Sequence, residues 1–248
     1  MRAQILNGPA EPDRPPLAPL LERLHATGHP GLSERKRFDL IEPAPGSFGV
    51  VVDDEDGHVV AYVRCVRAPG VAPGWTMELL THPHWRGRVE PEILCVLYVQ
   101  LLARGGGSLT WWTTDAGQEE LAVAWGWQVE RRLDRLVAPM PVTEPSGAPP
   151  GTTLRVLRGD AGDHRSLLQV NNAAFGDHPE QGGWSAGDLA RRMAADWYDR
   201  RHVTVAEREG SVCGFCWLKW HAPSRQVEVY AIGVDPARRA PGLGRALL

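Results

Sequence analysis

A glycine-bearing turn near the end of the chain has the composition of a phosphate site. Residues 239–245 read Arg-Ala-Pro-Gly-Leu-Gly-Arg, and they follow a strand-like segment, 227–234, that stops at Asp235-Pro236. A strand, a glycine-rich loop and a helix start together present bare backbone N–H groups, which glycine lets an anion approach closely. A dinucleotide fingerprint needs a third glycine where this chain has Leu247. The turn therefore predicts an anion site of another kind.

A carboxylate lies near the start of the same strand. Side chains alternate along a strand, so Glu228 is expected on the face of Tyr230 and Ile232. A carboxylate in this place can take a proton from a nucleophile that comes within hydrogen-bond reach. The alternative is a strand-end carboxylate that is only solvated.

The elements that position these residues occur in the second half of the chain. Period-two patterns and turn residues predict strands at 154–157, 202–206, 211–220 and 227–234. Helical spacing predicts helices at 163–175 and 185–198, the second with Ser185 as N-cap and Asp188 at its third position.

The first half shows a similar order. We expect helices at 16–26, 91–103 and 118–124, strands at 48–52, 59–66, 76–81 and 108–113, and a final strand pair at 127–138. Residues 138–151 hold five prolines without an apolar period and are expected to be a linker. The fold class is thus α/β, with a module at 1–137, the linker at 138–151 and a module at 152–248.

The two halves look like an internal duplication. A hairpin followed by a strand, a proline, a loop and a helix occurs twice, with Pro83 and Pro236 lying 153 residues apart. Aligned on these prolines, Val89 replaces Gly242, and its branched side chain would block an anion from the backbone. Glu90 adds a negative charge there.

The base position also differs between the copies. The same alignment puts Trp75 where the second copy has Glu228. The first copy is therefore expected not to catalyse.

Composition excludes several classes of protein. The chain has 248 residues, enough for two domains with cores of their own, and a net charge of −3 with a pI near 6.3. Neither value gives an electrostatic footprint for nucleic acid or an anionic membrane. No apolar run approaches the ~20 residues of a membrane span, and the N-terminus lacks a signal-peptide core. We expect a soluble, cytoplasmic monomer.

Cysteine and histidine pairs predict no metal. Cys213 and Cys216 lie on an expected strand, where side chains three apart point to opposite faces with Cα atoms roughly 10 Å apart. Neither a disulfide nor a shared ion fits that separation. His82-Pro83-His84 has no nearby cysteine or carboxylate in the sequence.

The turn and several motifs carry a family resemblance. The spacing Arg-x-x-Gly-x-Gly resembles the acetyl-CoA loop of the GNAT acyltransferase superfamily. Segments 170–175 (VNNAAF), 178–184 (HPEQGGW), 228–230 (EVY) and 234–237 (VDPA) resemble the mycothiol synthase family of tandem GNAT enzymes. The resemblance is dense from Thr153 onward and looser over residues 17–141. It implies two tandem GNAT modules, acetyl-CoA as co-substrate and the cysteinyl amine of desacetylmycothiol as acceptor.

The resemblance also assigns roles to residues. It makes Glu228 the general base and Glu34, Glu180, Lys219 and Glu228 the contacts to the sugar–cysteine substrate. Acetyl-CoA would be held by the strand end and the turn, namely Ile232, Gly233, Val234, Arg239, Ala240, Pro241, Gly242, Leu243, Gly244 and Arg245. Pro241 departs from the usual basic residue and removes one N–H. Leu79, Leu80 and Thr81 are the first-module counterparts, and whether they contact a second acetyl-CoA is left open.

The chain stops at Leu248, about one turn into the helix after the glycine loop. A complete GNAT module continues with a strand, another helix and a strand pair, which in this family carries the proposed general acid, a tyrosine. We therefore expect the 248-residue chain to be inactive in thioester cleavage, with a second half more sensitive to proteases than residues 17–141. A fragment, a misplaced stop and a natural remnant all remain open.

Two other functions remain open as well. One is a non-catalytic protein that binds acetyl-CoA, which the degenerate first module favours and Glu228 does not. The other is a GNAT enzyme that acetylates a different amine, such as an antibiotic or a protein N-terminus.

Overall fold

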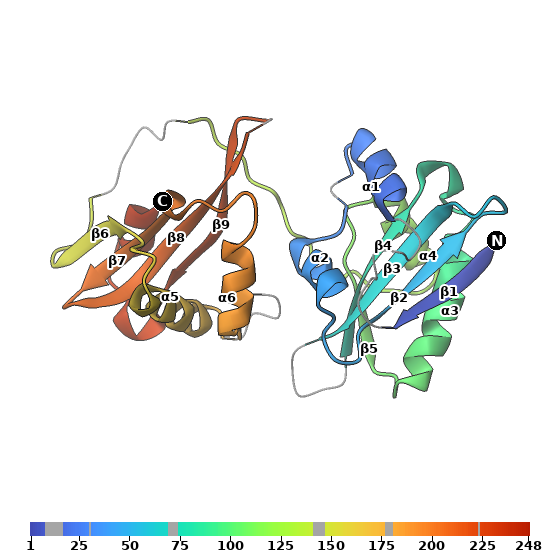
Figure 1. Ribbon diagram of the computed structural model, residues 1–248, viewed down its shortest axis with the longest axis horizontal. Coiled ribbons are helices and arrows are strands. Elements are labelled where there is room, and N and C mark those ends of the chain that lie inside the picture. The colour runs from blue at the N-terminus through green and yellow to red at the C-terminus, as the bar shows by residue number, and fades with distance from the viewer. Residues whose placement is uncertain (8–16, 30, 69–73, 141–146, 177–180, 223) are drawn as a thin grey trace. The chain divides into compact units, whose positions relative to one another are not determined.

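The computed structural model describes residues 1–7, 17–29, 31–68, 74–140, 147–176, 181–222 and 224–248 (Figure 1). The chain divides into two compact units, Met1–Asp134 and Arg135–Leu248. Apart from an additional 3-10 turn at 200–202 in the second unit, each unit runs through the same order of strand, two helices, three strands, a 3-10 turn and a helix. The prediction of two tandem α/β modules is therefore confirmed. Among the helices described, none has both the length and the apolar composition that crossing a bilayer requires.

The first unit is built on a five-stranded sheet in the order β1-β2-β3-β4-β5. Neighbouring strands are antiparallel except β4 and β5, which run parallel. The strands are β1 (Arg2–Asn7), β2 (Phe48–Asp53), β3 (Val59–Arg67), β4 (Gly74–Thr81) and β5 (Ser108–Trp111). The helices are α1 (Leu17–Ala26), α2 (Glu34–Ile41), α3 (Glu90–Ala103) and α4 (Ala116–Ala124), with a 3-10 turn, η1 (Pro83–Trp85), after β4.

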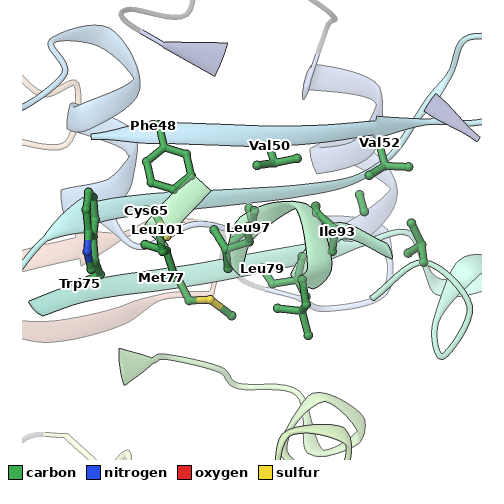
Figure 2. Packing of buried hydrophobic residues seen from close by; sticks show 14 of the residues in the cluster. Phe48, Val50, Val52, Cys65, Trp75, Met77, Leu79, Ile93, Leu97 and Leu101 are labelled. Carbon is green, nitrogen blue, oxygen red and sulfur yellow. The ribbon is translucent and has the colours of Figure 1, made fainter. Parts of the chain in front are cut away.

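Helices cover both faces of this sheet because its strands direct apolar side chains to each face. Ile93, Leu97 and Leu101 of α3 pack on one face, against side chains from β2, β3 and β4 (Figure 2). Leu20 and Leu24 of α1 pack on the other face. Burial on both faces explains why β2 and β3 are almost continuously apolar.

The second unit has a four-stranded antiparallel sheet in the order β6-β7-β8-β9. Its strands are β6 (Thr152–Val156), β7 (Val203–Arg208), β8 (Ser211–His221) and β9 (Gln226–Val234). Its helices are α5 (Ala161–Ala174), α6 (Ala186–Met193) and α7 (Leu243–Leu247), with 3-10 turns η2 (Arg200–His202) and η3 (Pro236–Arg238).

The two faces of this sheet are covered by different helices (Figure 1). Leu167 and Leu189, from α5 and α6, pack with Phe215 on one face, which we call the α5 face. Leu243 and Leu247 of α7 pack on the other, the α7 face. The segment that follows the glycine loop is thereby anchored to the sheet.

Two predicted elements differ in the structure. The helix expected at 185–198 begins as predicted, with a capping box between Ser185 and Asp188, but α6 ends at Met193. The chain then turns so that Trp197 and Tyr198 reach Trp217, with ring centroids 5.8 and 5.5 Å away. Burying these rings against β8 requires the chain to leave the helix.

The strand pair expected at 127–138 is wrong. This segment has no regular secondary structure. Trp127 packs against Trp111, and its Nε1 donates to the Tyr98 hydroxyl oxygen at 3.0 Å, but the side chains of Leu133 and Leu136 are 69% and 91% exposed. Apolar residues that bury nothing cannot offset the entropy of ordering a strand.

The cysteine prediction is also wrong in its geometry. Ala206 pairs with Gly214 and Glu207 with Val212, so Cys213 is the extra residue of a β-bulge. The bulge breaks the alternation and places Cys213 with Cys216 on the α7 face. Both thiols are free and buried, and burial raises the pKa of Cys216 to about 11.

His82 uses both of its ring nitrogens within the first unit. Nδ1 accepts from the backbone N–H of His84 at 3.2 Å, and Nε2 lies 3.0 Å from a guanidinium nitrogen of Arg23. In the second unit Asp235 caps η3 in the same way, accepting from the N–H of Ala237. The aligned prolines therefore mark the same capped turn in both units.

Candidate functional site

A β-bulge in β9 decides which side chains gather near Glu228. Trp217 pairs with Ala231 and Leu218 with Val229, so Tyr230 is the extra residue. Glu228 and Tyr230 therefore share the α5 face, as expected. Ile232 lies on the α7 face instead, so the prediction that it shares a face with Glu228 is wrong. An alternation counted through a bulge assigns every later residue to the wrong side.

Glu228 is held by a histidine. It is half exposed and lies directly opposite Lys219 in the β8–β9 pairing. Its Oε2 lies 2.6 Å from Nε2 of His221, two residues further along the same face of β8. A carboxylate oxygen can only accept, so the imidazole donates its Nε2 hydrogen. The carboxylate of Glu228 is thus hydrogen-bonded to His221 as well as exposed to solvent.

Aromatic rings surround Lys219 on this face. Its Nζ lies 4.5 Å from the ring centroid of Trp197 and 5.9 Å from that of Tyr230. Trp217 lies behind them, with its centroid 5.2 Å from that of Tyr230. A cation over aromatic faces is attracted by their negative π surfaces, so Lys219 has a fixed place beside Glu228.

Arg192 of α6 ties this cluster to the loop before the helix. Its guanidinium is buried and lies 4.0 Å from the ring centroid of Trp184. Its Nε donates to the Tyr230 hydroxyl oxygen at 3.1 Å, and Nη1 donates to the carbonyl of Asp188 at 3.0 Å. The bulged tyrosine is therefore locked in place.

The two sequence motifs of this unit meet through asparagines of α5. Asn171 donates its Nδ2 hydrogen to the carbonyl of Gln181 at 2.9 Å. Asn172 accepts from the backbone N–H of Trp184 at 2.9 Å and donates to its carbonyl at 2.8 Å. Glu180, a predicted substrate contact in this loop, lies outside the residues that the structure describes.

The glycine loop leaves β9 through η3 and ends at α7. Gly242 is the N-cap of α7 with φ +81°, in the left-handed region that favours glycine. Arg239, Pro241 and Arg245 are exposed, whereas the side chain of Leu243 is buried on the α7 face. Leu243 can therefore offer a ligand only its backbone.

The end of β9 presents main-chain groups beside this loop. Within the described part of its unit, β9 pairs with β8 alone, so the outer edge of β9 along residues 232–234 has no strand partner. Gly233 is also required by packing, because a Cβ there would lie 2.9 Å from Phe215 and 3.1 Å from Ala174.

The first unit differs at the positions that correspond to Gly242, to Leu243 and to the end of β9. Val89, in the place of Gly242, is fully buried in the core under α3. Glu90 is also buried. The side chains of Leu79, Leu80 and Thr81 are buried, and the carbonyl of Leu79 accepts from Nε2 of Gln118 at 3.1 Å.

The counterpart of Glu228 needs a correction. Lys219 corresponds to Val66 by the offset of 153, and Val66 pairs with Thr76. Because β4 has no bulge, the residue at the position of Glu228 is Thr76, and the predicted Trp75 is wrong. Thr76 accepts from Nζ of the buried Lys36 at 2.7 Å. The first unit has no carboxylate in this place.

Glu34 is the first residue of α2 in the first unit. Ser33, the N-cap of this helix, donates through its backbone N–H and its hydroxyl to the carboxylate of Glu78 at 2.7 and 2.5 Å.

Sequence reasoning missed His221, Arg192 and Trp197. His221 could have been found, since it stands two residues beyond Lys219 and so shares its face. Arg192 and Trp197 carried no signal, because their contacts depend on how α6 packs.

Comparisons with known proteins agree with this geometry. A family profile described as "Acetyltransferase (GNAT) family" matches residues 167–248. A crystal structure of a GCN5-related N-acetyltransferase from Sphaerobacter thermophilus aligns over 99% of this chain and 80% of its own, with a TM-score of 0.63 at 18% identity. Fold and loop thus define a protein of the GNAT acetyltransferase class.

Curated relatives narrow the class. The mycothiol acetyltransferase of Mycobacterium sp. (strain JLS) is 37% identical over 202 residues, which are 80% of this chain and 65% of that protein. The mycothiol acetyltransferases of Thermomonospora curvata and Tsukamurella paurometabola are 35% and 34% identical, and the matches cover 74% and 83% of their lengths and 90% and 99% of this chain. The chain belongs to the mycothiol acetyltransferase family. It spans about two thirds of the length of the Mycobacterium relative.

Proposed function

We propose that the second unit carries an acetyl-CoA-dependent N-acetyl transfer to the cysteinyl amine of desacetylmycothiol, with residues 152–248 as its catalytic module. The amine nitrogen attacks the thioester carbonyl, a C–N bond forms, the C–S bond breaks and coenzyme A leaves as the thiol. The observation that carries the proposal is the place of Glu228, on the strand that runs directly into the glycine loop and on a face lined by Lys219 and Tyr230.

Glu228 takes the proton that the amine loses. An α-amino group has a pKa near 8, so it is partly protonated at neutral pH and must lose a proton before or during attack. A carboxylate within hydrogen-bond reach, directly or through one water, performs this step. The half-exposed position of Glu228 lets an amine arrive from solvent.

Acetyl-CoA lies along the end of β9 and in the loop after it. The outer edge of β9 along residues 232–234 pairs with its pantetheine arm, and the backbone of the loop cradles the diphosphate. The open positive-φ turn at Gly242 supports this placement, since no side chain shields the backbone there. The loop residues proposed to contact it are Arg239, Ala240, Pro241, Gly242, Leu243, Gly244 and Arg245.

The acceptor contacts Lys219 and Glu228, with Glu180 as a further contact. An acceptor that places its amine at Glu228 passes the ammonium of Lys219, the residue directly opposite on β8. The ammonium can donate to hydroxyl and carbonyl oxygens of a sugar–cysteine conjugate. The first unit takes no part in the chemistry, because it has Thr76 and Val89 at the two decisive positions.

The test is a comparison of acceptors with residues 1–248 carried in a chain of the length of the curated relatives. Free thiol released from acetyl-CoA is measured with desacetylmycothiol, an aminoglycoside and a peptide with a free N-terminus, and isothermal titration measures acetyl-CoA binding separately. We expect thiol release with desacetylmycothiol. Preference for another amine would redirect the proposal to a different acceptor, and binding without turnover would identify a non-catalytic acetyl-CoA-binding protein.

A further inference from the structure

The imidazole of His221 lies beside the proposed base. His221 is the last residue of β8, and its side chain is 37% exposed. Its Nε2 lies 2.6 Å from Oε2 of Glu228, across the strand pair, and His221 is two residues beyond Lys219 on β8. The contact joins a rigid ring to a flexible carboxylate.

The contact leaves one oxygen of the base for chemistry. In the part of the chain that the structure describes, Oε1 of Glu228 has no hydrogen-bond partner, whereas Oε2 accepts from His221. A glutamate side chain has three rotatable bonds, and an exposed one samples many rotamers. Fixing one carboxylate oxygen restricts where the other can lie.

The pairing pattern makes this restraint specific to His221. Lys219 is directly opposite Glu228, yet its ammonium lies over the rings of Trp197 and Tyr230. Gln226, directly opposite His221, has its Oε1 bonded to Arg135 at 2.8 Å. His221 is thus the neighbour on this face that holds the carboxylate.

We propose that His221 is a positioning residue that donates its Nε2 hydrogen to Oε2 of Glu228 and aims Oε1 at the amine of the acceptor. This inference rests on the proposed function, in which Glu228 takes the amine proton. His221 itself touches neither substrate nor cofactor. It acts by keeping the base in its reactive rotamer, which raises kcat without changing how acetyl-CoA binds.

Two conservative variants separate positioning from packing. The side-chain nitrogen of glutamine reaches about as far as Nε2 of histidine, whereas that of asparagine corresponds to Nδ1. In the longer chain that serves for the comparison of acceptors, His221→Asn should lower kcat with desacetylmycothiol roughly 10-fold, because misplacing a reacting group by about 1 Å has effects of this size or larger. His221→Gln should stay within about 3-fold of wild type, and KM for acetyl-CoA should not change in either. Gln226→Leu, on the same face without contact to Glu228, is the matched control and should stay within about 2-fold.

The same pair is then measured with Glu228→Gln. Without the carboxylate, His221→Asn should have no further effect on the residual turnover, because the two residues act as one unit. Equal kcat in the glutamine and asparagine variants, or the same loss by His221→Asn in both backgrounds, would overturn the inference. Wild-type turnover in Glu228→Gln alone would instead remove the proposed base, so the two failures are distinguishable.

Discussion

Substitution of the two loop glycines should separate backbone strain from ligand contact. Gly242 has φ +81°, and a Cβ added there meets no atom within 4 Å. Gly242→Ala therefore creates no clash. It should destabilise the fold only by the cost of holding alanine in the left-handed conformation, about 1–2 kcal/mol. Gly244 lies inside α7, where a Cβ also meets no atom. Gly244→Ala should stabilise the unit by about 0.5–1 kcal/mol.

Binding should respond differently from stability. Both added methyl groups lie where we propose that the diphosphate approaches the backbone. Each should displace a hydrogen bond between an N–H and a charged oxygen, about 1.5–3 kcal/mol, which weakens acetyl-CoA binding roughly 10- to 100-fold. Gly244→Ala is the more telling variant, since it should fold more stably and bind less tightly.

The assay combines isothermal titration of acetyl-CoA with thermal unfolding of each variant. Gly210 provides the control, because it has φ +73° and open space around its Cβ but lies in the β7–β8 turn. Gly210→Ala should lose as much stability as Gly242→Ala, with Tm falling by about 4–8 °C per kcal/mol. It should bind acetyl-CoA as the wild type does. If Gly244→Ala were more stable and still bound acetyl-CoA normally, the diphosphate would not approach this loop.

Three further predictions concern other residues. Glu228→Gln should lower kcat roughly 10²- to 10⁴-fold while the Kd of acetyl-CoA stays unchanged, and wild-type turnover at neutral pH would contradict this. Gly242→Val should abolish turnover, and adding Val89→Gly should not restore it. Because Val89 is buried, Val89→Gly should also destabilise the first unit by about 2–4 kcal/mol. Turnover that survived Gly242→Val would assign the site to the first unit. The hydrogen bonds from Arg155 hold the pKa of Asp163 below its ordinary value, so this carboxylate stabilises the fold above that ordinary pKa, and the contribution is lost as the pH falls through the lowered one. Asp163→Asn should weaken the fall of the unfolding free energy at acid pH, measured by urea titration at a series of pH values. An unchanged pH dependence would argue against a stabilising role of this ion pair.

Long periodic elements were predictable from the sequence, because their burial follows simple repeats. The apolar spacing of α3 matches the side chains that enter the core in Figure 2, and the Ser185–Asp188 capping box begins α6 as expected. The loop after β9 was also readable, since a proline and two glycines impose its backbone. These signals depend on residues close together in the chain, so a single sequence is enough to predict the elements.

Elements held by polar contacts escaped prediction. The helix α2 is anchored by buried Lys36 and Asp39, which bond to Thr76 and to Arg64, and its sequence shows no apolar face. The edge strand β1 pairs with β2 through its backbone while most of its side chains stay at least partly exposed. Partners far away in the sequence define both elements.

The wrong predictions on β8 and β9 have one cause. Bulges at Cys213 and Tyr230 add a residue that no pattern of alternating side chains reveals. The predicted faces of Cys213 and Ile232, and the predicted counterpart of Glu228, all failed at these two positions. His221 was overlooked although the alternation along β8 beyond the bulge was intact.

The bulge at Tyr230 also sets how tolerance to mutation should vary along β9. Before it, even-numbered positions such as Glu228 face α5, and after it odd-numbered positions such as Gly233 do. A saturation scan of this strand should therefore show a two-residue rhythm whose phase inverts at Tyr230. Deleting Tyr230 would join Val229 directly to Ala231 and restore an unbroken ladder in which every other residue of β9 keeps its face. Inserting or deleting a residue elsewhere in β9 should be more harmful than deleting Tyr230, because the residues on one side of the change would exchange faces.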